Sequence, residues 1–173
     1  MSTNAAQVAT YVLEEEPVLA LRLLRVFGSP SDPVSAVEDR IAEQLPEFRT
    51  ILWEGNPETF QFSYVSTTAE QVLGYPARRW LEDATFWVDK IVHPDDRRDA
   101  VAFCALATAQ GRNHDFRYRA RTADGRIVTL LDVVQVVVGG RGVPVKLRGL
   151  MLEICPDGRI APREPRAMTS AND

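Results

Sequence analysis

The segment from Ile127 to Val138, "IVTLLDVVQVVV", constrains the fold more than any other part of this chain. It is apolar at nearly every position, and the exceptions are Thr129, Asp132 and Gln135. Successive side chains of a strand point to opposite faces of its sheet, so a strand here is apolar on both faces. Such a strand is expected where both faces of the sheet are covered. The rest of the chain must therefore supply covering elements on each side.

Other segments also have the pattern of strands. Residues 114–122, "HDFRYRART", alternate between apolar side chains and arginines, which is the period of a half-buried strand. Asp124 and Gly125 predict the hairpin turn that joins this segment to the apolar strand, because this dipeptide tolerates positive φ. Further strands are expected at residues 50–55, 59–66 and 145–154.

Helical segments lie between the strand pair at 50–66 and the three later strands. Two short helices are expected at residues 68–74 and 77–83, and one long helix at residues 95–110, ended by Gly111. This order predicts an α+β fold with one five-stranded antiparallel sheet. The central helices would cover one face of the sheet, and the N-terminal helices would cover the other.

The first 49 residues predict a helical extension. Pro17 and Gly28 bound a short helix, and a second helix begins near Pro33. Its apolar residues recur at spacings of three and four, so this stripe could cover the chain's own core, form a dimer or bind a partner. We expect a homodimer through the stripe, which consists of Val34, Val37, Ile41, Leu45 and Phe48. The domain itself is expected at 50–155, and 156–173 is expected to be a disordered tail.

Composition excludes several classes of function. The net charge of −4 gives no basic field to attract nucleic acid, so no nucleic-acid partner is expected. The N-terminus does not have the pattern of a signal peptide, and the most hydrophobic segment, "VLALRLLRVF", is about half the length of a membrane span. Cys104 and Cys155 have no metal-binding spacing and predict two reduced thiols. We expect a cytoplasmic protein that does not bind a membrane.

Five short motifs follow one another along the chain: "FSYVS", "VLGYP", "FWVDKIVHPDDR", "FRYRARTADGR" and "GVPVKLRGLMLEI". Together with the order of elements, they resemble the PAS domain with its C-terminal PAC motif, a sensory fold of bacterial signalling proteins. The resemblance covers roughly residues 50–155 and implies a non-enzymatic module that binds a small ligand or a protein partner. A possible signalling protein partner is therefore expected. The alternatives are a haem- or flavin-containing redox or gas sensor and a fragment of a larger sensor kinase or cyclase.

Two departures from the family pattern affect the expected mechanism. Thr129 or a neighbour stands where such domains usually have a tryptophan after the Asp-Gly turn. The final strand ends in Glu153, Ile154 and Cys155 and is followed by Pro156, which would block a C-terminal signalling helix. Signal transfer is therefore expected through the N-terminal helices or through an associated protein.

The histidines raise the question of a metal or a cofactor. His93, Asp95 and Asp96 are too few and too mixed for an ordinary zinc site, and acids at a helix start are favoured as caps. We therefore expect a helix entry there. The "GRNH" segment ending at His114 resembles the flavin motif "GRNC" of photosensory relatives, but it follows the long helix instead of preceding it. Cys104 is not in that motif's context. No metal, haem or flavin is expected, and His114 is expected to be exposed.

The resemblance also implies a ligand cavity between sheet and helices. Such cavities are mostly apolar with a few polar groups. Plain core packing is the alternative for every candidate, and no catalytic residue is expected because no acid–base pair or nucleophile motif is present. The candidate ligand-binding residues are Phe86, Trp87, Ile91, Phe103, Phe116, Tyr118 and Leu150.

Overall fold

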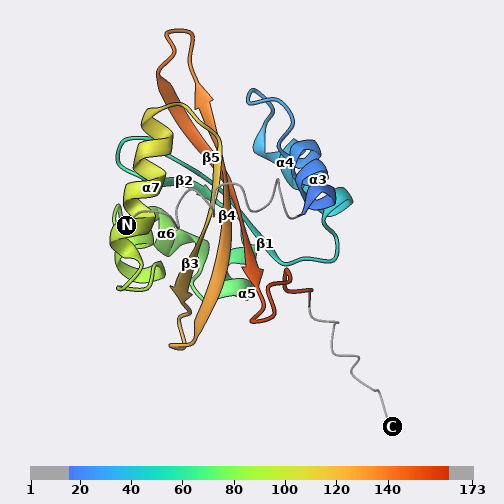
Figure 1. Cartoon of the computed structure of the whole chain (residues 1–173), viewed down its shortest axis with the longest axis vertical. Coiled ribbons are helices and arrows are strands. Elements are labelled where there is room, and N and C mark those ends of the chain that lie inside the picture. Colours follow the sequence, from blue (N-terminus) through green and yellow to red (C-terminus); the bar gives the residue numbers. More distant parts are fainter. Residues whose placement is uncertain (1–15, 164–173) are drawn as a thin grey trace.

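The computed structural model describes residues 16–163, in which helices cover both faces of one sheet (Figure 1). The helices are α3 (Pro17–Phe27), α4 (Val34–Gln44), α5 (Thr68–Leu73), α6 (Ala77–Glu82), the π-helical turn η1 (Trp87–Ile91) and α7 (Arg97–Ala109). The strands are β1 (Thr50–Gly55), β2 (Phe62–Val65), β3 (His114–Arg121), β4 (Ile127–Val138) and β5 (Pro144–Ile154).

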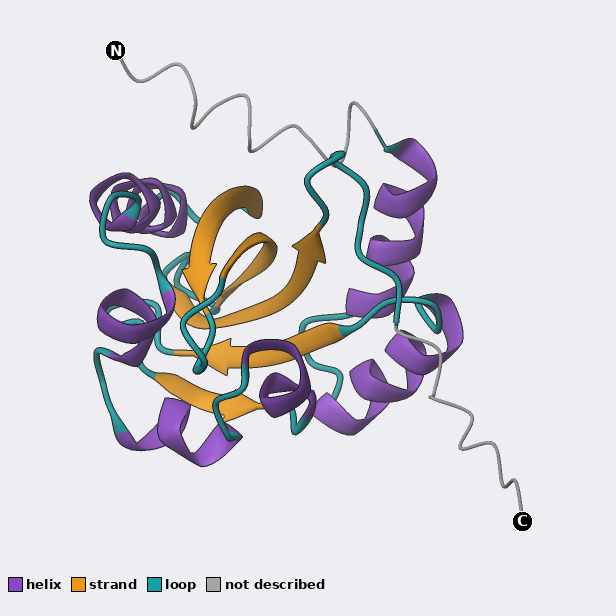
Figure 2. Cartoon of the chain, turned by 90° about the horizontal axis from the view of Figure 1, so that it is seen from below, coloured by secondary structure: helices purple, strands orange, loops and turns teal. Residues whose placement is uncertain are grey.

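The sheet is antiparallel throughout, with the strand order β2-β1-β5-β4-β3. β2, from the first half of the domain, and β3, from the second half, form the two edges of the sheet. β5 lies in the middle and pairs with both β1 and β4. The sheet is curved, as the view in Figure 2 shows. The predicted α+β class and five-stranded antiparallel sheet are confirmed.

The inner face of the sheet carries the larger hydrophobic cluster, against α5, α6, η1 and α7. Aromatic side chains dominate it, and Trp80 and Phe86 are almost completely buried, with their rings 5.7 Å apart. Leu130 of β4 points into this cluster, whereas its neighbour Leu131 points into the cluster on the other face. The strand is thus buried on both sides, as its composition requires.

The outer face is covered by α3 and α4 (Figure 1). Leu23 and Val26 of α3 pack there against Leu52 of β1 and Leu152 of β5. The residues predicted for a dimer contact lie in this same cluster, against the chain's own sheet, and the most deeply buried of them are at most 1% exposed. The apolar stripe of α4 therefore covers the core of its own domain. These stripe residues are Val34, Val37, Ile41, Leu45 and Phe48.

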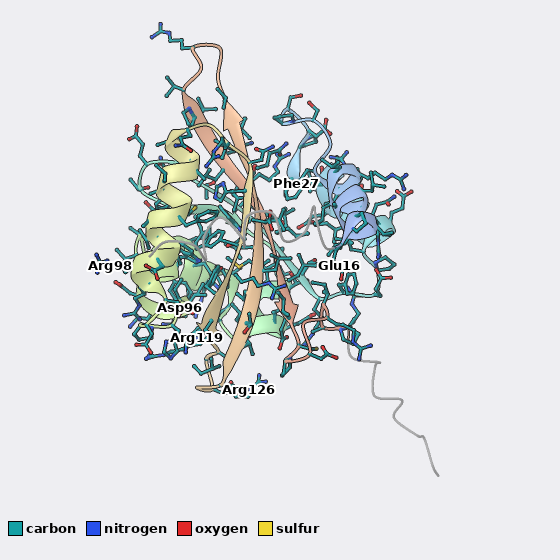
Figure 3. The ribbon with its side chains drawn as sticks, viewed as in Figure 1. Glu16, Phe27, Asp96, Arg98, Arg119 and Arg126 are labelled. Atoms are coloured by element: carbon teal, nitrogen blue, oxygen red, sulfur yellow. The ribbon has the colours of Figure 1, made fainter. Side chains whose placement is uncertain are left out.

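The entry to α7 differs in detail from the predicted cap. The helix begins at Arg97, and the side chain of Asp96 makes no capping hydrogen bond. Its carboxylate instead accepts bonds from the backbone amide and guanidinium of Arg119 on β3, at 2.6 to 3.0 Å (Figure 3). His93 Nδ1 accepts a bond from the amide of Asp95 at 3.2 Å, so the imidazole takes part in the turn. The stretch is a helix entry, as predicted, but Asp96 fastens it to the sheet.

The predicted tail is ordered over its first part. Pro156 and the residues after it form a turn, and the described segment after β5, residues 155–163, contains no helix. Residue Ala161 then donates its amide to the carbonyl of Glu153 at 2.8 Å, and Pro162 bridges to Phe48. Residues 156–163 therefore pack back on the domain, which corrects the expected disorder there. The remainder of the expected tail, residues 164–173, lies outside the described residues.

Candidate ligand cavity

A small cavity of about 20 Å³ lies between the inner face of the sheet and the helices. This is room for about one water-sized group. Its wall is almost entirely apolar and aromatic, with a single carboxylate. The lining residues are Trp53, Phe60, Phe62, Trp87, Cys104, Phe116, Asp132 and Met151.

The carboxylate of Asp132 is the centre of a hydrogen-bonded chain at this cavity. Trp53 Nε1 donates to Oδ1 at 3.0 Å, and the hydroxyl of Tyr118 donates to Oδ2 at 2.9 Å. Trp87 Nε1 in turn donates to the Tyr118 hydroxyl at 3.0 Å. Trp53 and Tyr118 thus donate directly to Asp132, which is only 1% exposed, and Trp87 acts through Tyr118. The network joins β1, β3, β4 and η1 around one buried acid.

Burial dominates the electrostatics of this network. It raises the pKa of Asp132 from 3.8 to about 7, although the bonds from Tyr118 and Trp53 favour the ionised form and oppose the rise. Burial, followed by the nearby charge of Asp132, also raises the pKa of Tyr118 well above 10. Asp132 is therefore the group whose charge changes near neutral pH, while Tyr118 keeps its proton.

Gly149 gives Trp53 the space to reach Asp132. The two residues are directly opposite on β5 and β1. A Cβ atom at Gly149 would lie 2.1 Å from Cε2 of the Trp53 indole, closer than any real contact. The indole therefore lies over a strand position that only glycine can occupy in this arrangement. Glycine in the middle of a strand often marks such a close approach.

A second polar contact lies beside the cavity, between Cys104 of α7 and His114 of β3. The thiol sulfur is 3.4 Å from His114 Nε2, and His114 Nδ1 is 2.9 Å from the carbonyl oxygen of Arg112. Burial raises the pKa of Cys104 to about 12 and lowers the pKa of His114. Both groups are consequently neutral at pH 7, and the pair is no thiolate–imidazolium nucleophile. His114 is 6% exposed, which corrects its predicted exposure.

The state of Cys104 leads to a labelling prediction. In the native protein at pH 8, iodoacetamide is expected to modify the partly exposed Cys155 and to spare the buried Cys104. A pKa of about 12 leaves roughly one Cys104 in ten thousand as thiolate at that pH. Peptide mapping by mass spectrometry measures both sites, and unfolding in urea serves as the control that exposes both. Equal labelling rates of Cys104 and Cys155 in the native protein would contradict the burial of Cys104.

Phe60 lies at the mouth of the cavity. It is the only non-glycine residue with positive φ in the described chain, at 59°, a conformation uncommon for a bulky side chain. The turn holds it there, since Asn56 accepts bonds from the amides of Glu58, Thr59 and Phe60. The ring is half-buried and meets Trp87 edge-on, with centroids 6.3 Å apart. Phe60 is thus the one lining residue that is not fully buried, and it marks the mouth of the cavity.

The structure brings most of the predicted ligand-binding residues together. Trp87 and Phe116 line the cavity, and Tyr118 supplies the hydroxyl of the network. Phe86, Ile91 and Phe103 belong to the same inner cluster or pack against it, but they do not line the cavity.

Leu150 is on the other face of the sheet. It packs in the outer cluster with the N-terminal helices, because alternate residues of β5 point in opposite directions. Its assignment to the ligand cavity is therefore corrected.

Several lining residues were not predicted. Of these, only Asp132 carried a visible signal, as a lone acid in an apolar strand. The unpredicted lining residues are Trp53, Phe60, Phe62, Cys104, Asp132 and Met151.

The cavity beside Asp132 does not fit a flavin or a haem. A cavity of about 20 Å³ is far below the several hundred Å³ of ordinary cofactor pockets. Both ring nitrogens of His114 already lie within bonding distance of groups of the chain itself, Arg112 and Cys104. Within residues 16–163, no cluster of three or more histidine, cysteine or acidic side chains could hold a metal ion. No helix in that range is long and apolar enough to cross a bilayer.

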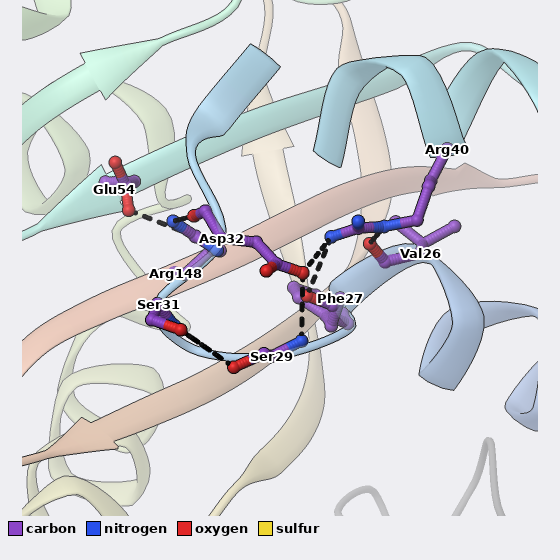
Figure 4. A network of polar contacts seen from close by, with 8 residues as sticks. All are labelled: Val26, Phe27, Ser29, Ser31, Asp32, Arg40, Glu54 and Arg148. Carbon is purple, nitrogen blue, oxygen red and sulfur yellow. Dashed lines mark hydrogen bonds and ion pairs between the residues drawn. The ribbon is translucent and has the colours of Figure 1, made fainter. Parts of the chain in front are cut away.

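The cavity wall is connected to the N-terminal helices through β1 and β5. Trp53 and Glu54 are consecutive on β1, so the indole points to the cavity and the carboxylate to the outer face. There Glu54 accepts a bond from Arg148 Nε at 3.0 Å, and Arg148 Nη2 donates to the carbonyl of Asp32 at 2.7 Å (Figure 4). Arg148 is 1% exposed. One buried guanidinium thus joins the sheet to the turn between α3 and α4.

That turn is itself held by a second arginine (Figure 4). Arg40 of α4 donates to the carbonyls of Val26 and Phe27 at the end of α3, at 2.9 and 3.3 Å, and to the carboxylate of Asp32 at 2.9 Å. Gly28 ends α3 with a φ of 56°, and a Cβ there would lie 2.7 Å from the Arg40 guanidinium. The two helices and their turn therefore move as one unit that Arg148 attaches to β5.

Comparisons with solved structures place this fold among sensory domains. The N-terminal domain of a diguanylate cyclase with a PAS/PAC sensor from Marinobacter aquaeolei is 35% identical over 60% of this chain and 94% of that chain, with a TM-score of 0.54. A sensory box histidine kinase/response regulator from Burkholderia thailandensis is 21% identical over 68% and 83%, with a TM-score of 0.52. The LOV protein of Rhodobacter sphaeroides is 18% identical over 63% and 61%, with a TM-score of 0.54.

The last two structures share the fold alone with this chain. No curated protein matches the sequence. The PAS fold family matches residues 62–151, which is more than half of the chain and spans β2 to β5. The match includes most of the cavity wall and the whole Trp87–Tyr118–Asp132 chain. This chain belongs to the PAS fold family.

Proposed function

We propose that this chain is a non-enzymatic sensory module that binds a small ligand in the Asp132 cavity and signals by a change in the packing of α3 and α4. The observation that carries the proposal is the pair of opposed contacts on adjacent residues of β1. Trp53 bonds the buried acid at 3.0 Å on one face, and Glu54 bonds Arg148 on the other. A PAS/PAC sensor in the related cyclase supports the sensory role. A cytoplasmic location stays a prediction from the sequence.

The strand register makes this coupling direct. Trp53 is opposite Gly149 and Glu54 is opposite Arg148, so both contacts lie on one two-residue segment of the β1–β5 ladder. A shift of the indole that accompanies ligand binding would rotate this segment and displace the guanidinium from the carbonyl of Asp32. A ligand changes the packing of α3 and α4 only to the extent that it binds one arrangement more tightly.

The coupling can be tested by hydrogen exchange in a Trp53→Phe variant. This change keeps an aromatic ring but removes the N–H that bonds Asp132. Amide exchange in α3 and α4 is expected to accelerate by about fivefold or more, the lower end of typical coupling between sites. Trp80→Phe is the matched control, because Trp80 is equally buried and its Nε1 bonds only the nearby carbonyl of Tyr75.

The two variants separate local coupling from general destabilisation. Trp80→Phe is expected to accelerate exchange around α5 and α6, without a selective effect on α3 and α4. Equal acceleration of α3 and α4 in both variants, or none in Trp53→Phe, would contradict the proposed route from cavity to helices.

A homodimer is part of the same proposal, but its surface is on α3. Val18, Leu21 and Leu24 are 69%, 57% and 65% exposed, and their spacing of three places them along one side of the helix. A groove of about 250 Å³ runs beside them, between α3 and the outer face of β3 and β4. Its apolar lining includes Leu23 and Val133. A second copy of the chain would cover this stripe, whereas the α4 stripe is already covered.

The dimer prediction is checked by light scattering on a Leu21→Glu, Leu24→Glu double variant. The wild type is expected to have the mass of a dimer, and the variant that of a folded monomer with an unchanged circular dichroism spectrum, since both side chains point to solvent within one chain. Leu106→Glu is the control, because Leu106 is 58% exposed on the distant α7. A monomeric wild type at high concentration would end the proposal and would favour a different signalling protein as the partner of α3.

A further inference from the structure

The carboxylate of Asp132 is buried without a cation. Among the ion pairs of the described residues, none includes Asp132, and its only bonds come from the neutral side chains of Trp53 and Tyr118. The buried carboxylate of Glu54, on the other face, has both Arg148 and Lys146 within 3.0 Å. Buried charges in proteins are normally paired. Asp132 is thus a buried acid for which residues 16–163 supply no counterion.

The donors around Asp132 favour a negative charge at the cavity wall. Trp53 and Tyr118 both donate to it, and Trp87 orients the Tyr118 hydroxyl by donating to its oxygen. An ionised carboxylate can accept roughly four bonds, so about two positions are left for a further donor. The cavity that Asp132 lines is the space where such a donor can lie.

The rest of the wall is suited to a cation. The face of an aromatic ring attracts ammonium groups, most strongly when the site is desolvated, and tryptophan is the best of these rings. Two of the five aromatic lining residues are tryptophans. Rings around a single carboxylate combine charge pairing with cation–π attraction, and an anion would meet repulsion from both. The aromatic lining residues are Trp53, Phe60, Phe62, Trp87 and Phe116.

We propose that the cavity binds a small alkylammonium cation, with its nitrogen beside Asp132 and its carbon atoms among the aromatic rings. The inference rests on the proposed ligand-binding function and names the chemical class of the ligand. A volume of about 20 Å³ accommodates the ammonium head, and a longer alkyl group would leave past Phe60 at the mouth. The ligand would replace the missing counterion of Asp132.

Binding should depend on pH mainly through Asp132, the one group at the cavity wall whose charge changes near neutral pH. The groups that face it are Tyr118 of β3 and Cys104 of α7, whose pKa values are raised, and His114 behind Cys104, whose pKa is lowered. Tyr118 and Cys104 keep their protons from pH 5.5 to 8, and the lowered pKa of His114 keeps its imidazole mostly neutral down to at least pH 6.5. Because Asp132 has a pKa of about 7, a cation should bind about 30-fold more weakly at pH 5.5 than at pH 8.

The test uses the indole N–H signals in ¹H–¹⁵N spectra of the full chain. There are three tryptophans, so Trp53 and Trp87 report on the cavity while Trp80 serves as an internal reference outside it. Methylammonium chloride is titrated to about 0.1 M, a range suited to ligands of so few atoms. Sodium chloride controls for ionic strength, and methanol is the neutral probe of equal size. Saturable shifts of Trp53 and Trp87 with methylammonium only, weaker at pH 5.5, are expected.

Two variants make the assignment specific. Asp132→Asn keeps the size and removes the charge, and is expected to weaken methylammonium binding at least about tenfold, as for loss of a charged hydrogen-bond partner. Tyr118→Phe removes a hydrogen bond that favours the ionised form of Asp132, so methylammonium binding is expected to weaken at pH 7 and its pH midpoint to rise. It provides the test if Asp132→Asn does not fold, which the Trp80 signal reports.

The outcomes separate the ligand class from ligand binding itself. Equal shifts with methanol and methylammonium, unchanged in Asp132→Asn, would overturn the ammonium assignment and leave a cavity for neutral ligands. Shifts that appear equally with sodium chloride would overturn it as well. If neither probe moves Trp53 or Trp87, the ammonium assignment fails, and so does the proposal that this cavity takes small ligands.

Discussion

Replacing Asp132 with asparagine should make the protein more stable at pH 8 than the wild type, by a margin that disappears in acid. The sign follows from linkage. The folded-state pKa of Asp132, about 7, lies above its unfolded value near 3.8, so its stabilising contribution is complete below pH 3.8 and is lost as pH rises to 7 and beyond. Between pH 4.5 and 8, the wild type should lose about 3 kcal/mol relative to the variant.

The measurement is urea unfolding of both proteins at a series of pH values, taken as a difference. The difference matters because other acids have the opposite dependence. The pKa of Asp96 is lowered, mainly by its bond with Arg119, and the pKa of Asp83 is lowered by bonds from Thr85, so both favour folding at higher pH. These contributions are common to wild type and variant and cancel. A difference that stays constant from pH 4.5 to 8 would mean that Asp132 is ionised throughout, with a strongly favourable environment.

The fold could be predicted because its signals are local. The double-faced strand β4, the Asp-Gly turn and the helix boundaries at Pro17 and Gly28 depend on neighbours in sequence, and each is found where the pattern placed it. The fate of the α4 stripe could not be predicted in the same way. An apolar helix face packs equally well on its own sheet or on a second subunit, and only the tertiary arrangement shows which surface remains exposed.

The cavity was less predictable because it depends on side-chain direction and on contacts between distant strands. Leu150 was assigned to the wrong face, although Lys146 and Arg148 share its face of β5 and are the polar signal in the sequence that this face is the outer one. Trp53 reaches Asp132 only because Gly149 lies opposite it, a relation across about one hundred positions of sequence. Asp132 itself was visible as an acid in an apolar strand, but its partners were not.

Replacing Arg148 with methionine should destabilise the fold by about 3 kcal/mol, because removal of one partner leaves a buried charge without its hydrogen bonds. Glu54 would then retain only Lys146, and the carbonyl of Asp32 would lose its donor. The free energy of unfolding in urea measures the effect. Lys146→Met is the matched control, since Lys146 lies 2.9 Å from the same carboxylate oxygen but its side chain is 34% exposed. That change should cost less than about 1 kcal/mol.

A double-mutant cycle then separates the ion pair from the attachment of the helices. In Glu54→Gln, Arg148→Met, the unpaired carboxylate is gone, so the second change should cost less than it does in the wild type. The part that remains measures the bond from Arg148 to Asp32, and it should appear as faster amide exchange in α3 and α4. If Arg148→Met is as mild as Lys146→Met and leaves that exchange unchanged, Arg148 does not fasten the N-terminal helices to the sheet. The proposed path would then end at Glu54, because Trp53 could move the sheet without moving the helices.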